Sequence, residues 1–138
     1  MDDHEEIVQA SVMIADNQDV IWARAVGREL ASTLGFSSAN QARFAISISE
    51  LARNVLDYAK RGVCTFSTRM ENGRPIILLV VSDEGAGIPD LVLALSPGFS
   101  SSSGLGQGLP TVRRLMGNLT IDSRPGRTVI ETIMRSEV

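Results

Sequence analysis

The stretch ELARNVLD, residues Glu50 to Asp57, is the part of the sequence around which the predicted fold is organised. At about 100° per residue, Asn54 lies one helical turn after Glu50, and Asp57 continues the same polar stripe. A carboxylate can accept a proton, and a carboxamide oxygen can hold a hard cation such as Mg²⁺ without adding charge. An ordinary solvated helix face has the same residue types, so this stretch alone leaves both interpretations open.

The helix that carries this stretch is expected over residues 39–60, with a serine as its N-cap and Gly62 as its C-terminal stop. Its polar stripe also includes Arg43 and Arg61. Apolar side chains occupy another side of the helix, namely Phe44, Ala45, Ile48, Leu51, Ala52, Val55, Leu56 and Ala59. The helix therefore has one flank that can pack into a hydrophobic core and one flank whose polar side chains could take part in catalysis or ligand binding.

Composition limits the classes of protein to which the chain can belong. A length of 138 residues with 43% hydrophobic and 21% charged residues predicts one soluble domain over residues 1–138. A net charge of −3 gives no electrostatic reason to expect nucleic acid as a partner, and an aromatic content of 4% leaves no platform for stacked bases. The longest apolar run, Ile76 to Val81, is too short to span a membrane.

The rarest residue types exclude two further kinds of site. Cys64 and His4 are the only cysteine and histidine, so neither an internal disulfide nor a Cys/His metal site is expected. The first residues are acidic, whereas a secretory signal needs a basic start and an apolar run. We therefore expect a cytoplasmic protein.

Periodicity and turn residues predict the remaining elements and the fold class. In chain order these are a strand at 6–15, a helix at 18–34, the helix at 39–60, strands at 63–70 and 75–82, a short helix at 91–95, a helix at 109–116, and strands at 118–123 and 128–135. Gly35 is expected to end the first helix, and Asn72 with Gly73 predicts a hairpin turn. The order indicates an α+β two-layer sandwich, in which helices cover one face of a mixed, mostly antiparallel sheet.

The octapeptide DEGAGIPD follows the apolar strand at 75–82. Asp83, at the end of a buried strand, could accept a hydrogen bond from an exocyclic amine such as that of adenine. Gly85 and Gly87 carry no side chain, so a flat ligand could approach the main chain there. A loop in which Asp83 only caps a turn explains the same residues, and the octapeptide alone does not separate the two interpretations.

A second glycine-rich run, PGFSSSSGLGQG at residues 97–108, leads into the helix predicted at 109–116. Its composition fits a mobile lid and also a disordered loop. Free backbone N–H groups and the positive end of the helix dipole would suit phosphate at that helix start. The run lacks the lysine of a Walker A loop and the third glycine of a dinucleotide fingerprint.

Taken together, three motifs resemble those of the GHKL ATPase superfamily, the group of gyrase, histidine kinases and MutL. ELARN at Glu50–Asn54 is similar to its N box, DEGAGI at Asp83–Ile88 to its first glycine box, and GLGQGL at Gly104–Leu109 to its second. The nearest resemblance is to the RsbT-type switch-protein serine kinases of bacteria, with SpoIIAB-type anti-sigma kinases as near relatives. It extends over essentially the whole chain and implies the Bergerat ATP-binding fold.

The resemblance implies a role for each matching residue. Asn54 would ligate Mg²⁺ on the phosphates of ATP, and Glu50 would be the general base for an attacking hydroxyl. Asp83 would accept the adenine amine. Many relatives have a neutral or basic residue in place of Asp57, so a modest phosphate affinity is expected. The other residues implied at the nucleotide are Asp57, Gly85, Gly87, Ile88, Gly104, Leu105, Gly106, Gly108, Leu109 and Thr128, although Thr128 also suits a plain strand.

The resemblance also implies the partners. The substrate would be an STAS-domain protein of the stressosome or an anti-anti-sigma factor, with a PP2C-type phosphatase or a sigma factor as a further partner.

Three functions stay open: a serine/threonine kinase, a nucleotide-dependent anti-sigma factor or phosphatase activator that acts by binding, and a detached catalytic domain of a histidine kinase system. Because His4 is the only histidine, a serine or threonine on a separate protein is the favoured acceptor. The oligomeric state stays open.

Overall fold

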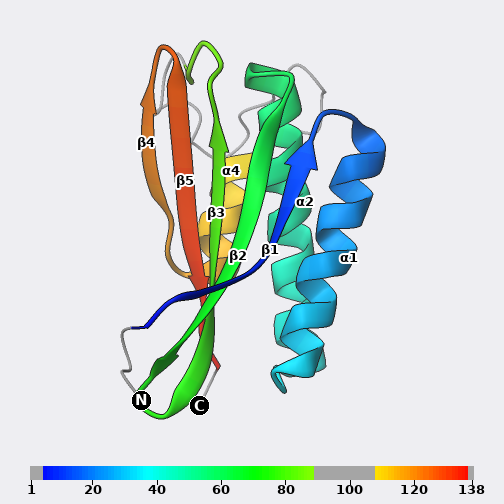
Figure 1. Ribbon diagram of the computed structural model, residues 1–138, viewed down its shortest axis with the longest axis vertical. Helices are drawn as coiled ribbons and strands as arrows, with labels where there is room; N and C mark the ends of the chain where they lie inside the picture. Colours follow the sequence, from blue (N-terminus) through cyan, green and yellow to red (C-terminus); the bar gives the residue numbers. More distant parts are fainter. Residues whose placement is uncertain (1–4, 89–107, 137–138) are drawn as a thin grey trace.

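The computed structural model describes residues 5–88 and 108–136 of the chain. Its elements, labelled in Figure 1, are β1 (Ile7–Ile14), α1 (Asn17–Thr33), α2 (Ser38–Tyr58), β2 (Gly62–Glu71), β3 (Arg74–Asp83), α4 (Gly108–Met116), β4 (Thr120–Arg124) and β5 (Arg127–Met134). These agree with the predicted elements to within about two residues at each end. The short helix predicted at 91–95 lies outside the described residues.

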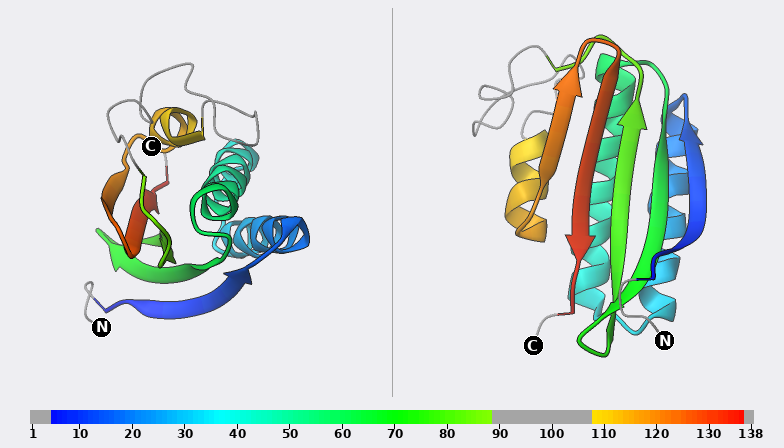
Figure 2. Two further views of the ribbon diagram at one scale, coloured as in Figure 1. Left: turned by 90° about the horizontal axis from the view of Figure 1, so that it is seen from above. Right: turned by 60° about the vertical axis from the view of Figure 1, so that its left-hand side comes forward.

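The five strands form one antiparallel sheet in the order β1-β2-β3-β5-β4. The three helices lie on one face of this sheet, which Figure 2 shows from above, so the predicted two-layer arrangement is confirmed. The apolar strand β3 is the central strand, and its residues 76–79 are all buried. The predicted burial on both faces is met along this stretch only, because Val80 and Ser82, on the face away from the helices, are partly exposed. Within the described ranges, no helix has the length and apolar character needed to cross a membrane.

The core forms between the helical layer and the alternate strand residues that face it. The apolar flank of α2 is buried as predicted, and the ring of Phe44 meets that of Phe66 on β2 edge to face, with centroids 6.1 Å apart. Gly27 allows α1 to approach closely, because a Cβ atom there would lie 2.2 Å from Cδ1 of Ile48. This packing holds α2 across the sheet and thereby fixes the direction of its polar flank.

Local sequence signals set the ends of most elements. Asp16 and Asp19 form a capping box at the start of α1, and the Ser37 side chain accepts the Asn40 N–H at the start of α2. Asn72 and Gly73 have φ angles of +53° and +77°, the pair of positive values that a type I′ hairpin turn requires. The Asn72–Gly73 turn and a serine cap of α2 were predicted from the sequence, whereas the Asp16–Asp19 capping box was not.

The end of α2 differs from the prediction. The helix ends at Tyr58 and not at residue 60, because Lys60 takes a left-handed conformation with φ +72° while its N–H donates to the Val55 carbonyl. Gly62 is therefore not the helix stop; it is the first residue of β2, where a Cβ atom would lie 2.4 Å from the Ser82 carbonyl oxygen. Arg61 consequently lies beyond the helix and does not belong to its polar stripe.

Candidate nucleotide site

The polar flank of α2 provides Glu50, whose carboxylate is mostly shielded from solvent. Arg53 lies on the next turn, and its Nη1 donates to Oε1 of Glu50 across 3.2 Å. Desolvation by burial raises the pKa of Glu50; the Arg53 cation lowers it in part, and the Asp57 anion raises it further. Burial thus makes this carboxylate a better proton acceptor than an exposed glutamate.

The start of α4 lies beside this carboxylate. A Cβ atom on Gly108, the first residue of α4, would be 3.5 Å from Oε2 of Glu50. The next residue, Leu109, is buried in the core and anchors the helix start there. The first N–H groups of a helix have no partner within the helix, and they carry its positive dipole end. The structure therefore places the proposed base next to a helix start suited to phosphate.

Asp83 marks the other end of the candidate site, at the last position of β3. Its carboxylate is largely buried, and Oδ1 accepts the Gly85 N–H at 3.0 Å. Desolvation raises the pKa of Asp83, and the Gly85 hydrogen bond offsets part of that rise. Thr128 on β5 is its cross-strand partner and is also buried, so these two predicted residues lie side by side.

The loop after Asp83 packs directly on the end of α2. A Cβ atom on Gly85 would lie 2.5 Å from Cβ of Ala59 and 2.6 Å from the Tyr58 carbonyl oxygen. Gly87 has a φ of +90°, and a Cβ atom there would lie 2.9 Å from the Arg124 carbonyl oxygen. Both glycines are therefore required by close backbone approach, in addition to any contact with a ligand.

Ser123 on β4 is a residue that the sequence analysis missed. Its Oγ accepts the Ile88 N–H at 2.8 Å and lies 2.7 Å from Oγ1 of Thr128. The loop that follows Asp83 is thus tied through Ser123 to the residue opposite Asp83. Ser123 could have been found from the predicted hairpin between the last two strands, because pairing across that turn places Ser123 opposite Thr128.

The structure places several of the predicted residues close to α2. Glu50 and the start of α4 lie near its middle, while Asp83 and Gly85 lie at its C-terminal end. Glu50 and Ala59 are nine positions apart, which at a rise of about 1.5 Å per residue is about 13.5 Å, a distance suited to an extended nucleotide. Asn54 and Asp57 lie on α2 between these ends, both partly buried. Gly104, Leu105 and Gly106 lie outside the described residues.

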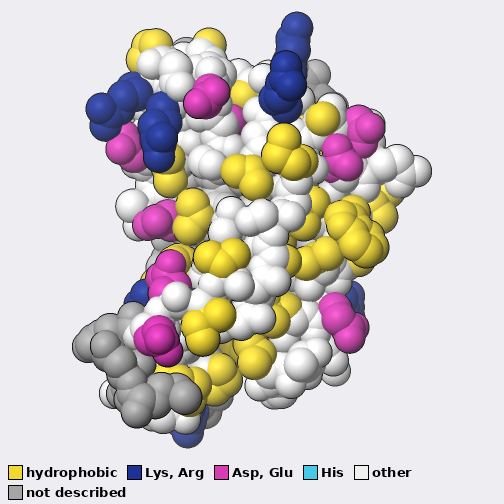
Figure 3. Space-filling view, in the orientation of Figure 1, with side chains coloured by type: hydrophobic (Ala, Val, Ile, Leu, Met, Phe, Trp, Pro, Cys, Tyr) yellow, Lys and Arg dark blue, Asp and Glu magenta, His cyan; other side chains and the backbone are white. Residues whose placement is uncertain are grey.

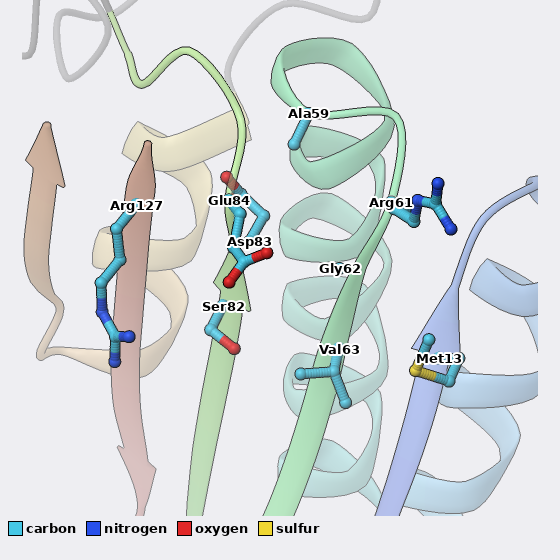
Figure 4. Close-up of a pocket in the computed structure, with 9 residues that line it drawn as sticks. All are labelled: Met13, Ala59, Arg61, Gly62, Val63, Ser82, Asp83, Glu84 and Arg127. Carbon is cyan, nitrogen blue, oxygen red and sulfur yellow. The ribbon is translucent and has the colours of Figure 1, made fainter. Parts of the chain in front are cut away.

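A cavity of about 440 Å³ adjoins the Asp83 end of this site, as Figure 4 shows. Its lining includes Met13, Val63, Ser82 and Arg127, which alternate with core residues and so belong to the sheet face away from the helices. The cavity shares Asp83 with the candidate site and does not include Glu50 or Asn54. It is an opening next to the candidate site and is separate from the part that contains Glu50 and Asn54.

Comparison with known proteins identifies the arrangement. A family described as histidine kinase-, DNA gyrase B- and HSP90-like ATPases matches residues 39–136. The chain belongs to this ATPase family. It is also 40% identical over 126 residues to the serine/threonine-protein kinase RsbT of Bacillus subtilis (strain 168), covering 91% of this chain and 95% of that protein. The resemblance to RsbT-type GHKL ATPases is thereby confirmed.

A solved structure agrees with this assignment at the level of the fold. The RsbU and RsbW domains of Rv1364c from Mycobacterium tuberculosis match 92% of this ATPase chain with a TM-score of 0.64 and 18% identity. The chain corresponds to 32% of that longer protein. The match therefore supports the two-layer ATPase architecture.

The oxygen donors of this ATPase site fit Mg²⁺ bound together with a nucleotide. Among the described residues, no group of three or more His, Cys, Asp or Glu side chains could hold a metal by itself. Mg²⁺ usually keeps several waters and takes one or two protein oxygens together with substrate phosphates. The Asn54 carboxamide, next to the Glu50 turn of α2, can provide such an oxygen without adding charge.

Proposed function

We propose that this chain transfers the γ-phosphate of ATP to a serine or threonine of an STAS-domain partner in a bacterial partner-switching pathway. Its enzyme class is that of ATP-dependent protein serine/threonine kinases, the class of its relative RsbT. The observation that carries the proposal is that Glu50 lies beside the start of α4, with the Asp83 loop packed at the far end of the same helix. In this proposal, Glu50 would be the base, the start of α4 would hold the phosphates, and the Asp83 loop would hold the adenine.

In the proposed reaction, the hydroxyl oxygen of the partner attacks the γ-phosphorus while its proton moves to Glu50. The bond from the γ-phosphorus to the bridging oxygen breaks, and ADP leaves. Asn54 would hold Mg²⁺, which when bound neutralises charge on the phosphates. Asp83 would accept the adenine amine, and the N–H groups at the start of α4 would face the phosphates. Catalysis then consists of positioning and charge neutralisation.

The test uses purified protein, labelled ATP with Mg²⁺, and an STAS-domain protein encoded beside it. We expect acid-stable label on a serine or threonine of that partner. Glu50→Gln should keep nucleotide binding and lose at least about a hundredfold in transfer rate, a typical contribution of a general base. Asn54→Ala should weaken binding of Mg²⁺–ATP more than binding of ATP alone.

The same experiment separates the alternatives. Stable association with the partner and no label would favour a protein that acts by binding, and an acid-labile phosphate on a partner histidine would favour a histidine kinase system. Full transfer activity in Glu50→Gln would refute the role proposed for that residue. Arg43→Gln is a matched control, because Arg43 is exposed at the N-terminal part of α2 and bonds to Asn40.

A further inference from the structure

The two edges of the sheet differ in their protection against strand pairing. Strand β4 forms one edge with five residues, and its Asp122 and Arg124 form an exposed ion pair before Pro125. Strand β1 forms the other edge with eight residues, IVQASVMI, which include no charged residue and no proline. Short, charged edges resist pairing with other chains, whereas long uncharged edges offer free backbone groups to them. The pairing of β1 with β2 does shift register between Val8 and Ala10, an irregularity that also hinders strand addition, so the stretch after Ala10 is the uninterrupted part of this edge. The β1 edge is therefore the less protected of the two.

Exposed apolar side chains gather on this same side of the molecule. Six large hydrophobic residues are exposed among the described residues, and five of these belong to the consecutive elements β1 and α1. These five, which we call the β1–α1 surface, are Ile7, Val8, Met13, Ile21 and Trp22, each between 51% and 65% exposed. Figure 3 shows hydrophobic surface on this side of the sheet and on the adjoining helix. Met13 faces away from the helical layer whereas Ile21 and Trp22 lie on α1, so the β1–α1 surface wraps around the β1 edge. Exposed apolar surface is typical of interaction sites.

The charges at the two ends of β1 select the kind of partner. Glu5 and Glu6 precede the strand, and Asp16 and Asp19 follow it. Arg69 offsets one of these charges through its 3.6 Å contact with Glu6. Asp16 and Asp19 also accept backbone N–H groups at the start of α1, and the cation Arg61 lines the cavity that contains Met13. A second copy paired antiparallel along the full strand would place its glutamates against these aspartates. Like charges placed opposite each other destabilise a strand pair, so the charges disfavour a second copy along the full strand.

We propose that the β1–α1 surface binds an extended segment of a different protein, apolar in its centre and basic at its ends. The segment would add a sixth strand beside β1, with its backbone groups satisfying the free edge. Its apolar side chains would cover Val8 and Met13, and the surrounding protein would contact Ile21 and Trp22. Its basic ends would face the acidic residues that flank the strand. This proposal does not depend on the phosphoryl-transfer function.

The probe is a synthetic peptide of eight alternating valine and threonine residues with two lysines at each end. Trp22 is the only tryptophan and is exposed, so its fluorescence should shift to shorter wavelength when the peptide covers it. The same peptide with glutamates at its ends should bind about tenfold more weakly, and this difference should shrink in 1 M salt, where the Debye length is about 3 Å.

Matched variants locate the binding site. Val8→Lys on the β1 edge and Ile21→Lys on α1 should each weaken binding by about tenfold, because each places a charge in an apolar contact. Val8→Thr keeps a β-branched side chain and should bind nearly as well as the unaltered protein. Thr120→Lys makes the same kind of change on the β4 edge and should have no effect. Thermal unfolding of each variant checks that its fold is intact.

Three results would overturn the proposal. The first is no binding of either peptide, and the second is an equal effect of Thr120→Lys and Val8→Lys. The third is a dimer, measured by sedimentation without peptide, that Val8→Lys dissociates, since a second copy would then occupy the surface. Loss of phosphoryl transfer in Glu50→Gln tests the catalytic site alone, so failure of one proposal is distinguishable from failure of the other.

Discussion

At the scale of single residues, Glu50 lies between two charges that act on it in opposite directions. Burial raises its pKa above the usual 4.5, the Arg53 cation lowers it, and the Asp57 anion raises it. A general base must be ionised, so the transfer rate should fall as the pH drops through this raised pKa. The acid limb of the pH–rate profile reports this group directly.

We expect two substitutions to move that acid limb in opposite directions. Arg53→Met removes the cation that lowers the pKa of Glu50, so the limb should move to higher pH. Asp57→Asn removes the anion that raises this pKa, so the limb should move to lower pH. The measurement is kcat as a function of pH with saturating Mg²⁺–ATP. Arg53→Lys keeps a positive charge and serves as the control; shifts in the same direction for both substitutions would contradict the proposed base.

Ser123 is expected to matter for stability although it belongs to none of the three motifs. Ser123→Ala removes the acceptor of the Ile88 N–H and the neighbour of the Thr128 hydroxyl. Leaving such groups without a partner should lower the free energy of unfolding by about 1–3 kcal/mol. Urea denaturation measures this change. Ser11→Ala is the control, because Ser11 is exposed and its contact with Thr65 is long at 3.4 Å; an equal loss in both variants would argue against the role of Ser123.

At the scale of elements, the contact between the loop after β3 and the end of α2 depends on Gly85. A methyl group there would meet the backbone of Tyr58 and Ala59, which cannot move as a flexible side chain can. Gly85→Ala should therefore destabilise the protein by about 1–3 kcal/mol, the range of overpacked cores, and should weaken nucleotide binding. Thermal unfolding and calorimetric titration with ATP measure the two effects.

Gly117 provides the comparison for this prediction. It ends α4 with a φ of +76°, and a Cβ atom there would meet nothing within 4 Å. Gly117→Ala should cost about 1–2 kcal/mol from backbone strain alone and leave nucleotide affinity unchanged. If both variants lost nucleotide affinity equally, the effect of Gly85→Ala would be general instability and not disruption of the site.

At the scale of the whole molecule, Cys64 reports on global opening. It is the only cysteine, it is fully buried in the core on β2, and burial raises the pKa of its thiol to about 12. The thiolate is the reactive form, so alkylation should require unfolding of the sheet. We expect global unfolding to limit labelling by iodoacetamide, measured by mass spectrometry. The labelling rate should follow either the rate of unfolding or the equilibrium population of the unfolded state. Labelling at the rate of a free cysteine in native buffer would contradict this expectation.

Nucleotide should slow that labelling if it binds only the folded state. At a concentration about 100 times its Kd, a ligand adds about 2.7 kcal/mol to the free energy of unfolding, which corresponds to about a hundredfold lower population of the open form. Mg²⁺–ATP should have this effect on the unaltered protein and a much smaller one on Asn54→Ala. The comparison measures binding without requiring catalytic activity.

Within the described residues, the predicted elements and their order were correct because they rest on local signals. The turn at Asn72–Gly73, the caps of the first two helices and the stops at Gly35 and Gly117 each follow from the conformation that those residues prefer. The end of α2 was predicted wrongly. A glycine at position 62 looked like a helix stop, yet the close approach of Ser82 requires it as a strand residue, and Lys60 ends the helix.

The sequence by itself determined the order of the elements, the polar and apolar flanks of α2, and the chemical types available to the site. Periodicity and turn residues act within a few positions, so they can be recognised without a fold. Only the tertiary structure decided that the start of α4 lies beside Glu50, that Ser123 ties the Ile88 loop to Thr128, and that β1 is the less protected edge. Those features join residues that are distant in the chain, and their positions follow from how the layers pack.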